Sequence, residues 1–201
     1  MDGTLVDSTE VVEQVWGRFA EANDVDLHLL LATSHGVKAV DTIRQHAPHL
    51  DAETAAAELA AYELTQNAGI VEVSGAAAFA ALVPDSGFAV VTSAPTELAR
   101  LRLELCGIRP PQVLIGAEDV RNGKPDPEPY LTAAAALGLP AEDCVVFEDA
   151  PAGIRAGLDA GMRVVVVGAV DADIASGLPR IADYTNSTIE PGDDGFTIVL
   201  D

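Results

Sequence analysis

The first part of the chain carries apolar residues at helical spacing. Val11, Val15 and Phe19 recur every four positions within residues 9–23, and this period places them along one face of an amphipathic helix. Further helices are predicted over residues 27–32, 39–45, 52–67 and 75–82. Residues 9–81 contain no segment with the pattern of a strand, so we expect this region to consist of helices.

Residues 82–201 have a different pattern, in which short apolar runs alternate with helical segments. Continuous apolar runs are typical of strands that are buried on both faces of a parallel sheet. They predict strands over residues 88–91, 113–115, 145–147 and 164–167, with helices between them over residues 95–106, 127–137 and 151–160. Near the C-terminus, a hairpin is predicted from residues 187–189 and 196–200, with its turn at residues 192–195. The alternation predicts an α/β fold with a Rossmann-like, doubly wound parallel sheet.

The order of these segments predicts an α/β core that is interrupted by a helical insertion. We assign residues 1–8 and 82–201 to the core and residues 9–81 to the insertion. The first eight residues read as the end of a buried strand, a turn and the start of a helix. Asp7 is the expected N-cap of that helix, and Glu10 completes a capping box.

The charge and composition exclude several classes of partner. The chain carries 32 acidic and 11 basic side chains, which gives a formal net charge of −21 and argues against nucleic acid or an anionic membrane as a partner. It has neither an apolar stretch of about 18 residues, as a membrane span requires, nor the start of a signal peptide. Cys106 and Cys144 lie far apart in apolar surroundings and are predicted to be free thiols. We expect a cytoplasmic protein, either a monomer or a weak dimer.

Polar residues directly follow two of the predicted strands. Thr92 and Ser93 follow the first strand, and Glu148 and Asp149 follow the third. In open α/β sheets, ligands bind at the carboxyl ends of the strands. Hydroxyl groups at such a place can hold a phosphate oxygen, and paired carboxylates suit Mg²⁺. Each pair also has a simpler interpretation, because Thr and Ser are common helix caps and acidic residues are common in solvated loops.

Lys124 lies in the loop before the predicted helix at residues 127–137. The chain has only one other lysine, Lys38. A lysine ammonium neutralises a phosphoryl group and a neighbouring carboxylate. A solvated surface lysine is the simpler interpretation, but the scarcity of lysine and the flanking Gly123 and Pro125 favour a functional role.

Together, and in this order, these segments resemble the four motifs of the haloacid dehalogenase-like phosphohydrolases. The matching residues are Asp2-Gly3-Thr4 for motif I without its first Asp, Thr92 and Ser93 for motif II, Lys124 for motif III, and Glu148 and Asp149 for motif IV. The helical insertion lies where members of subfamily IA carry a C1-type cap. The resemblance therefore covers nearly the whole chain.

The resemblance implies a Mg²⁺-dependent phosphatase that works through an aspartyl-phosphate intermediate. The nucleophilic Asp belongs one position before Met1, and Asp2 is the implied general acid/base. The implied ligands of Mg²⁺ are that first Asp, the backbone carbonyl of Asp2, Asp149, and Glu148 either directly or through water. The groups implied to hold the phosphate are Thr92, Ser93 and Lys124.

The sequence as given has no residue at the nucleophile position. We therefore expect the chain as given to be inactive. Our hypothesis is that Met1 is not the native start, because motifs II, III and IV are intact. The alternative is a non-catalytic protein on the same scaffold.

The insertion contains an element that bears on the substrate. Residues 34–38, Ser-His-Gly-Val-Lys, interrupt its predicted helices and resemble an element of the sugar- and polyol-phosphate phosphatases of the family. His35, Gly36 and Lys38 are therefore expected to contact a small phosphorylated metabolite, although a plain turn with an exposed His and Lys fits the pattern equally well. A β-phosphoglucomutase-like phosphotransferase is the alternative reaction.

Overall fold

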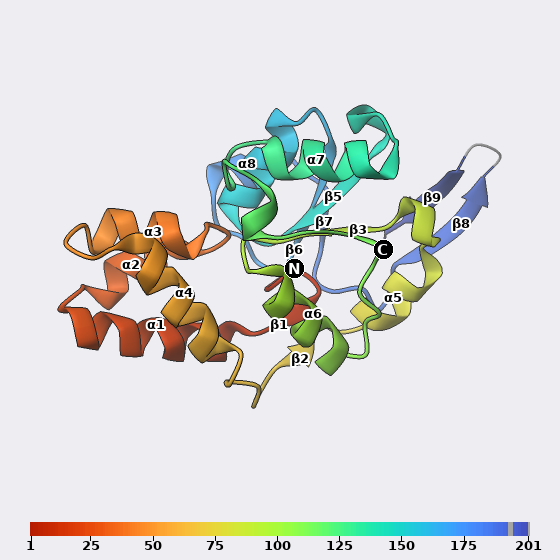
Figure 1. The fold of residues 1–201 in the computed structure, drawn as a ribbon. Coiled ribbons are helices and arrows are strands. Elements are labelled where there is room, and N and C mark those ends of the chain that lie inside the picture. The colour runs from red at the N-terminus through yellow and green to blue at the C-terminus, as the bar shows by residue number, and fades with distance from the viewer. Residues whose placement is uncertain (193–194, 201) are drawn as a thin grey trace.

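In the computed structural model, which describes residues 1–192 and 195–200, a helical part and an α/β part lie side by side (Figure 1). The helical part consists of α1 (Thr9–Asn23), α2 (Leu27–Ser34), α3 (Ala39–His46) and α4 (Ala52–Glu63). Their apolar faces share one buried cluster, whose members include Val15, Trp16, Leu30, Ile43 and Leu59. The predicted helices are confirmed, although α4 ends earlier than the pattern indicated.

The start of α1 differs from the predicted capping box. Ser8 is the N-cap residue, and its side chain makes no capping hydrogen bond. Ser8 Oγ instead donates to Asp2 Oδ1 over 2.7 Å, and Asp7 Oδ1 accepts a hydrogen bond from the backbone N of Thr9 at 3.2 Å. The prediction of Asp7 as N-cap is wrong, because the helix begins one residue later and the hydroxyl of its true cap is bonded elsewhere.

The α/β part contains two groups of parallel strands. The first group pairs β3 (Ala89–Val91) with β4 (Val113–Ile115), and the second has the order β5 (Val145–Glu148), β6 (Arg163–Val167), β7 (Arg180–Ile181). Val90 lies opposite Leu114 in the first group, and Val146 lies opposite Val164 in the second. The predicted parallel α/β architecture is confirmed. Within residues 1–192 and 195–200, no strand pairing joins β3 to β5.

Helices cover both faces of these strands (Figure 1). One face carries α7 (Glu128–Leu137) and α8 (Pro151–Asp159), and the other carries α5 (Ala76–Leu82) and α6 (Thr96–Leu105). In β6, Val164 and Val166 belong to the buried cluster beneath α7 and α8, whereas Val165 and Val167 belong to the cluster beneath α5 and α6. Successive side chains of a strand point to opposite faces, so a strand covered on both faces needs a continuous apolar run.

A short ribbon connects the helical part to the rest of the chain. β1 (Val6–Asp7) pairs antiparallel with β2 (Val71–Glu72), so the segment that enters the helical part lies beside the segment that leaves it. The expectation that residues 9–81 contain only helices is therefore wrong. The helix that follows β2, α5, packs Phe79 against Phe147 of β5, with ring centroids 5.6 Å apart. The division into residues 1–8 and 82–201 against residues 9–81 stays a prediction.

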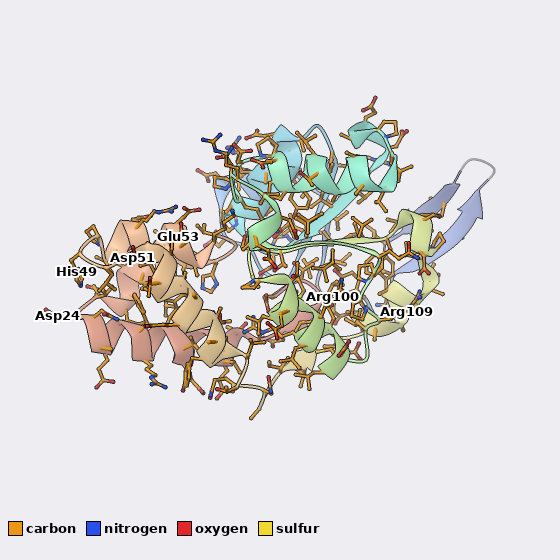
Figure 2. The ribbon with its side chains drawn as sticks, viewed as in Figure 1. Asp24, His49, Asp51, Glu53, Arg100 and Arg109 are labelled. Carbon is orange, nitrogen blue, oxygen red and sulfur yellow. The ribbon has the colours of Figure 1, made fainter. Side chains whose placement is uncertain are left out.

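The remaining features of the chain agree with the sequence. β8 (Thr188–Gly192) and β9 (Gly195–Val199) form the predicted hairpin, whose predicted turn includes residues 193–194, outside the described residues. Cys106 and Cys144 are free thiols. Glu53 of the helical part and Arg109 of the α/β part are exposed (Figure 2). Among the described residues, no helix has the length and apolar character needed to cross a membrane.

Leu103 provides a test of the packing beneath α6. Its side chain is fully buried in the cluster shared with Val90 and Leu114, whereas Leu105 on the same helix is 48% exposed. Leu103→Ala leaves a cavity, and we expect it to lower the free energy of unfolding by about 2–5 kcal/mol in a urea titration. Leu105→Ala is the matched control and should change it by less than about 1 kcal/mol. Equal losses in the two variants would contradict the packing described.

Candidate active site

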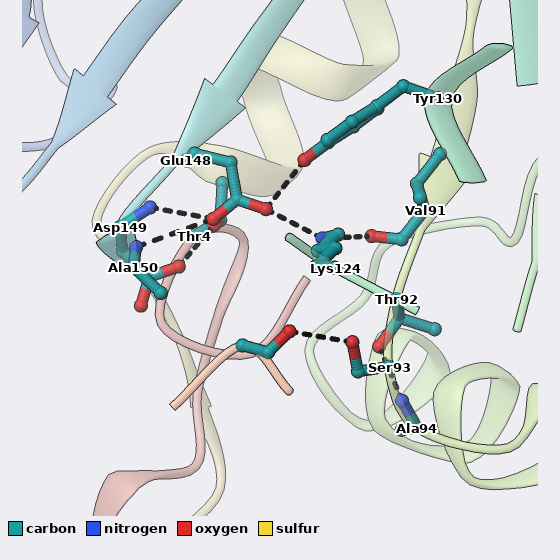
Figure 3. Close-up of polar contacts among 11 residues, drawn as sticks. Thr4, Val91, Thr92, Ser93, Ala94, Lys124, Tyr130, Glu148, Asp149 and Ala150 are labelled. Carbon is teal, nitrogen blue, oxygen red and sulfur yellow. Dashed lines mark hydrogen bonds and ion pairs between the residues drawn. The ribbon is translucent and has the colours of Figure 1, made fainter. Parts of the chain in front are cut away.

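The carboxyl ends of β3 and β5 meet the N-terminal turn at one edge of the α/β part (Figure 3). A cavity of about 720 Å³ opens there, between this edge and the helical part. Its lining contains all the residues singled out in the sequence, namely Asp2, His35, Gly36, Lys38, Thr92, Ser93, Lys124, Glu148 and Asp149. The structure thus brings together side chains that lie up to 147 positions apart in the chain.

A buried ion pair lies at this edge of the sheet. Lys124 Nζ lies 2.6 Å from Glu148 Oε1 and donates a second hydrogen bond to the carbonyl oxygen of Val91 at 3.2 Å (Figure 3). Lys124 and Glu148 are only 4% and 3% exposed. Burial opposes the charged form of Glu148, but the charge of Lys124, the N-terminal ammonium group and the hydrogen bonds from Lys124 and Tyr130 together outweigh it and lower the pKa of Glu148. The solvated-lysine and solvated-loop interpretations are therefore wrong for these two residues.

Tyr130 completes the surroundings of Glu148. It lies on α7, and its hydroxyl donates to Glu148 Oε1 over 2.5 Å. Burial and the neighbouring carboxylate raise the pKa of Tyr130 well above its usual value, so the hydroxyl keeps its proton and acts as a donor. No local pattern predicts this role, because an inward-facing Tyr on an Ala-rich helix looks like an ordinary core residue.

Asp149 faces the N-terminal turn. Its Oδ1 accepts a hydrogen bond of 2.6 Å from Thr4 Oγ1. Burial and the charge of Glu148 raise the pKa of Asp149, so its charge is only partly compensated by the protein. Gly3 has φ of +71°, and a Cβ atom there would lie 1.9 Å from Asp149 Oδ2. Only glycine therefore allows the turn to approach the carboxylate this closely.

These groups suit Mg²⁺ in chemistry and in charge. Asp149 is an under-compensated carboxylate beside the turn that carries Asp2, and hard oxygen ligands are what Mg²⁺ prefers. In the part of the chain that is described, no three His, Cys, Asp or Glu residues converge on one point. Mg²⁺ typically binds through one or two carboxylates and keeps several waters, so such a sparse set is sufficient.

Thr92 and Ser93 leave β3 and do not cap the next helix. The N-cap of α6 is Pro95, and it has no side-chain capping bond, so the helix-cap interpretation is wrong. Thr92 Oγ1 accepts a hydrogen bond from the backbone N of Ala94 at 3.1 Å, which leaves its proton available to a ligand. Ser93 Oγ donates to the carbonyl oxygen of Gly36 over 2.8 Å and so contacts the helical part.

Residues 34–38 dock on the core rather than standing free. Gly36 has φ of +77°, and a Cβ atom there would lie 3.0 Å from Ala150 Cβ. Lys38 is buried and donates to the carbonyl oxygen of Val120 at 2.7 Å, so the interpretation as a plain turn with an exposed lysine is wrong for this residue. His35 is exposed and lines the cavity, where it can contact a ligand.

Asp2 is held by two donors. Its Oδ1 accepts from Ser8 Oγ at 2.7 Å and from Arg102 Nη1 at 2.9 Å, and Arg102 Nη2 lies 2.9 Å from Glu63 Oε1 of α4. Arg102 was not among the residues predicted from the sequence. A signal was present, because Ala99, Arg102 and Leu103 share one face of the helix by their spacing, and a charged residue on an apolar face needs a buried partner.

Comparisons with known proteins agree with this geometry. Residues 1–161 match the family model described as haloacid dehalogenase-like hydrolase. Hexitol phosphatase A of Escherichia coli (strain K12) is 39% identical over 178 residues, which cover 84% of this chain and 81% of that protein. Glycerol-1-phosphate phosphohydrolase 2 of Saccharomyces cerevisiae (strain ATCC 204508 / S288c) is 37% identical over 179 residues, which cover 82% of this chain and 71% of that protein. A hydrolase from Pseudomonas syringae has a similar fold, with a TM-score of 0.77, 21% identity and 90% coverage of both chains.

The buried pair of Lys124 and Glu148 predicts a pH-dependent stability. Lys124→Met leaves a buried carboxylate without its cation, and we expect a loss of about 3–5 kcal/mol in the free energy of unfolding near neutral pH. The lowered pKa of Glu148 makes the pair's contribution complete above the ordinary value of 4.5 and removes it as the pH falls further. In the Lys124→Met variant, burial without the cation raises the pKa of Glu148. The difference in free energy of unfolding between the variant and the parent protein should therefore become smaller as the pH falls.

Urea titrations across this pH range, without added Mg²⁺, measure the deficit. The control is Arg155→Met, which breaks an exposed pair with Asp159 at 3.9 Å and should cost less than about 0.5 kcal/mol. A deficit that is small, or that does not change with pH, would show that the ion pair does not stabilise the fold.

Proposed function

The chain belongs to the haloacid dehalogenase-like hydrolases, and on this basis we propose that it is a Mg²⁺-dependent phosphatase of small phosphorylated sugars or polyols. Its relatives named for their activity include a hexitol phosphatase and a glycerol-1-phosphate phosphohydrolase, both above 35% identity. These matches support the hydrolysis of phosphoric monoesters. The class of substrate is the finer part of the proposal.

One observation carries the proposal. A hydroxyl, an ammonium group and three carboxylates, which come from segments far apart in the sequence, line a single cavity. Thr92 and Lys124 supply hydrogen-bond donors and positive charge for the phosphoryl group. Asp149 and the carbonyl of Asp2 are the groups that would hold Mg²⁺, which supplies further positive charge to the phosphoryl oxygens when it is bound.

Asp2 is the residue that we propose moves a proton. Its Oδ1 is occupied by Ser8 and Arg102, while Oδ2 has no hydrogen-bond partner within the described residues. Oδ2 can therefore give a proton to the leaving alcohol and later take one from the attacking water. The family pattern places the nucleophilic carboxylate one position before Met1. In a protein that carries this carboxylate, phosphorus would be attacked in line from that side.

The helical part forms the other wall of the cavity and faces the alcohol portion of the substrate. This wall carries the polar side chains of His35, Arg44 and Glu53 and the small side chains of Ala56 and Ala60. Polar groups of both charges suit a substrate with several hydroxyl groups, because hydroxyls both donate and accept hydrogen bonds. This wall supports a sugar or polyol phosphate as the substrate class.

Metal removal and one carboxylate substitution test this proposal. The full-length protein, with every residue encoded upstream of Met1, should release inorganic phosphate from hexitol and glycerol phosphates with Mg²⁺ and not after EDTA treatment. Asp149→Asn should lower kcat at least about 100-fold, because it removes a carboxylate that would hold the metal. Asp159→Asn, at the exposed end of α8, is the matched control and should keep the parent rate.

The reaction products distinguish a phosphatase from a mutase. Phosphate assays combined with phosphorus NMR distinguish free phosphate from phosphate moved to another position of the sugar. Turnover that persists without divalent metal, or an active Asp149→Asn variant, would overturn the mechanism. Transfer between sugar positions without phosphate release would overturn the phosphatase in favour of a mutase.

A further inference from the structure

A buried arginine connects the proposed acid/base to the helical part. Arg102 lies on α6 and is 1% exposed. One end of its guanidinium group contacts Asp2 Oδ1, and the other end contacts Glu63 Oε1, both at 2.9 Å. Asp2 belongs to the N-terminal turn of the core, whereas Glu63 is the last residue of α4 in the helical part. The three side chains line the same cavity.

Because Arg102 is buried, it needs both of its carboxylate partners. A guanidinium group taken out of water needs charged or polar partners for its donors, and here the two carboxylates supply them. Arg102 Nε is buried and has no partner among the described residues, so the side chain depends on its two terminal nitrogens. If α4 moved away from α6, Arg102 would lose one of its two partners and the constraint on Asp2 would loosen.

We propose that Arg102 is a positioning residue that makes the placement of Asp2 depend on the docking of the helical part. When Glu63 is in contact, the guanidinium group is fixed at both ends and holds Asp2 by Oδ1. Oδ2 then faces the cavity, where a proton passes from it to the oxygen of the leaving alcohol as the P–O bond breaks. This inference rests on the proposed function.

The dependence on the leaving group provides a test that a purely structural role would not pass. An alkoxide leaving group needs a proton, whereas p-nitrophenolate leaves without one. In the full-length protein with Mg²⁺, Glu63→Gln should lower kcat/KM for glycerol 1-phosphate about tenfold and leave p-nitrophenyl phosphate within about twofold. Arg102→Lys should show the same selective loss, because an ammonium group cannot span both carboxylates as the planar fork does.

The matched control is Glu58→Gln, on the exposed face of α4. It removes the same charge from the same helix and should behave like the parent protein with both substrates. Equal losses on the two substrates in Glu63→Gln would mean that the contact only stabilises the fold, and unchanged activity on both would also overturn the positioning role.

A second measurement does not depend on activity. Asp2→Asn and Glu63→Gln are combined in a double-mutant cycle of urea unfolding, because each removes one partner of Arg102. The double variant should be destabilised by more than the sum of the single variants, with a coupling of about tenfold in the unfolding equilibrium constant, because it leaves a buried cation unpaired. In an Arg102→Met background this extra loss should vanish or reverse, since only two like charges remain.

The activity assays and the double-mutant cycle distinguish a failure of the positioning role from a failure of the proposed function. An additive cycle would show that Arg102 does not couple the two carboxylates, and it would overturn the inference whatever the activity. A coupled cycle with no selective loss of activity would overturn the positioning role alone and leave the phosphatase intact. A full-length protein that releases no phosphate from any ester would overturn the proposed function, and the positioning role with it.

Discussion

The ion pair between Lys124 and Glu148 is the contact on which the rest of the site depends. Lys124 reaches the carbonyl at the end of β3 and the carboxylate at the end of β5, so one ammonium group links the two groups of strands. Burying this pair is costly unless each charge is well compensated, and the hydroxyl of Tyr130 adds the further donor that Glu148 needs. The same lysine that would neutralise a phosphoryl group thus also fixes the distance between the strand ends that surround it.

Negative charge is the second constraint on the site. The chain has a net charge of −21, and the edge of the sheet adds Glu148 and Asp149 side by side. An anionic substrate would be repelled unless local cations offset this field. Lys124 is already paired with Glu148, and burial together with the charge of Glu148 raises the pKa of Asp149, so a further cation beside Asp149 would favour its charged form. A divalent cation at Asp149 would balance this charge and attract the phosphate, which connects the acidity of the site to the proposed use of Mg²⁺.

Several polar contacts join the helical part to the core. The carbonyl of Gly36 accepts from Ser93, Lys38 donates to the carbonyl of Val120, and Glu63 pairs with Arg102. Interfaces of this kind are typical of parts that move relative to one another, because polar groups exchange partners with water more readily than apolar surfaces separate. The helical part also forms one wall of the cavity.

The sequence by itself determined the α/β class, the order of most helices and strands, and the residues that follow the strands. These features depend on local periodicity and on the rule that parallel strands carry their ligands at their carboxyl ends.

Tertiary structure decided the contacts that join distant segments. The two-residue strand β2 exists only because β1 lies beside it, and Ser8 contacts Asp2 because the N-terminal turn folds back on itself. Tyr130 and Arg102 acquire their roles from carboxylates 18 and 100 positions away. No local pattern predicts such pairs, because the burial that makes them necessary arises only when the helices pack on the sheet.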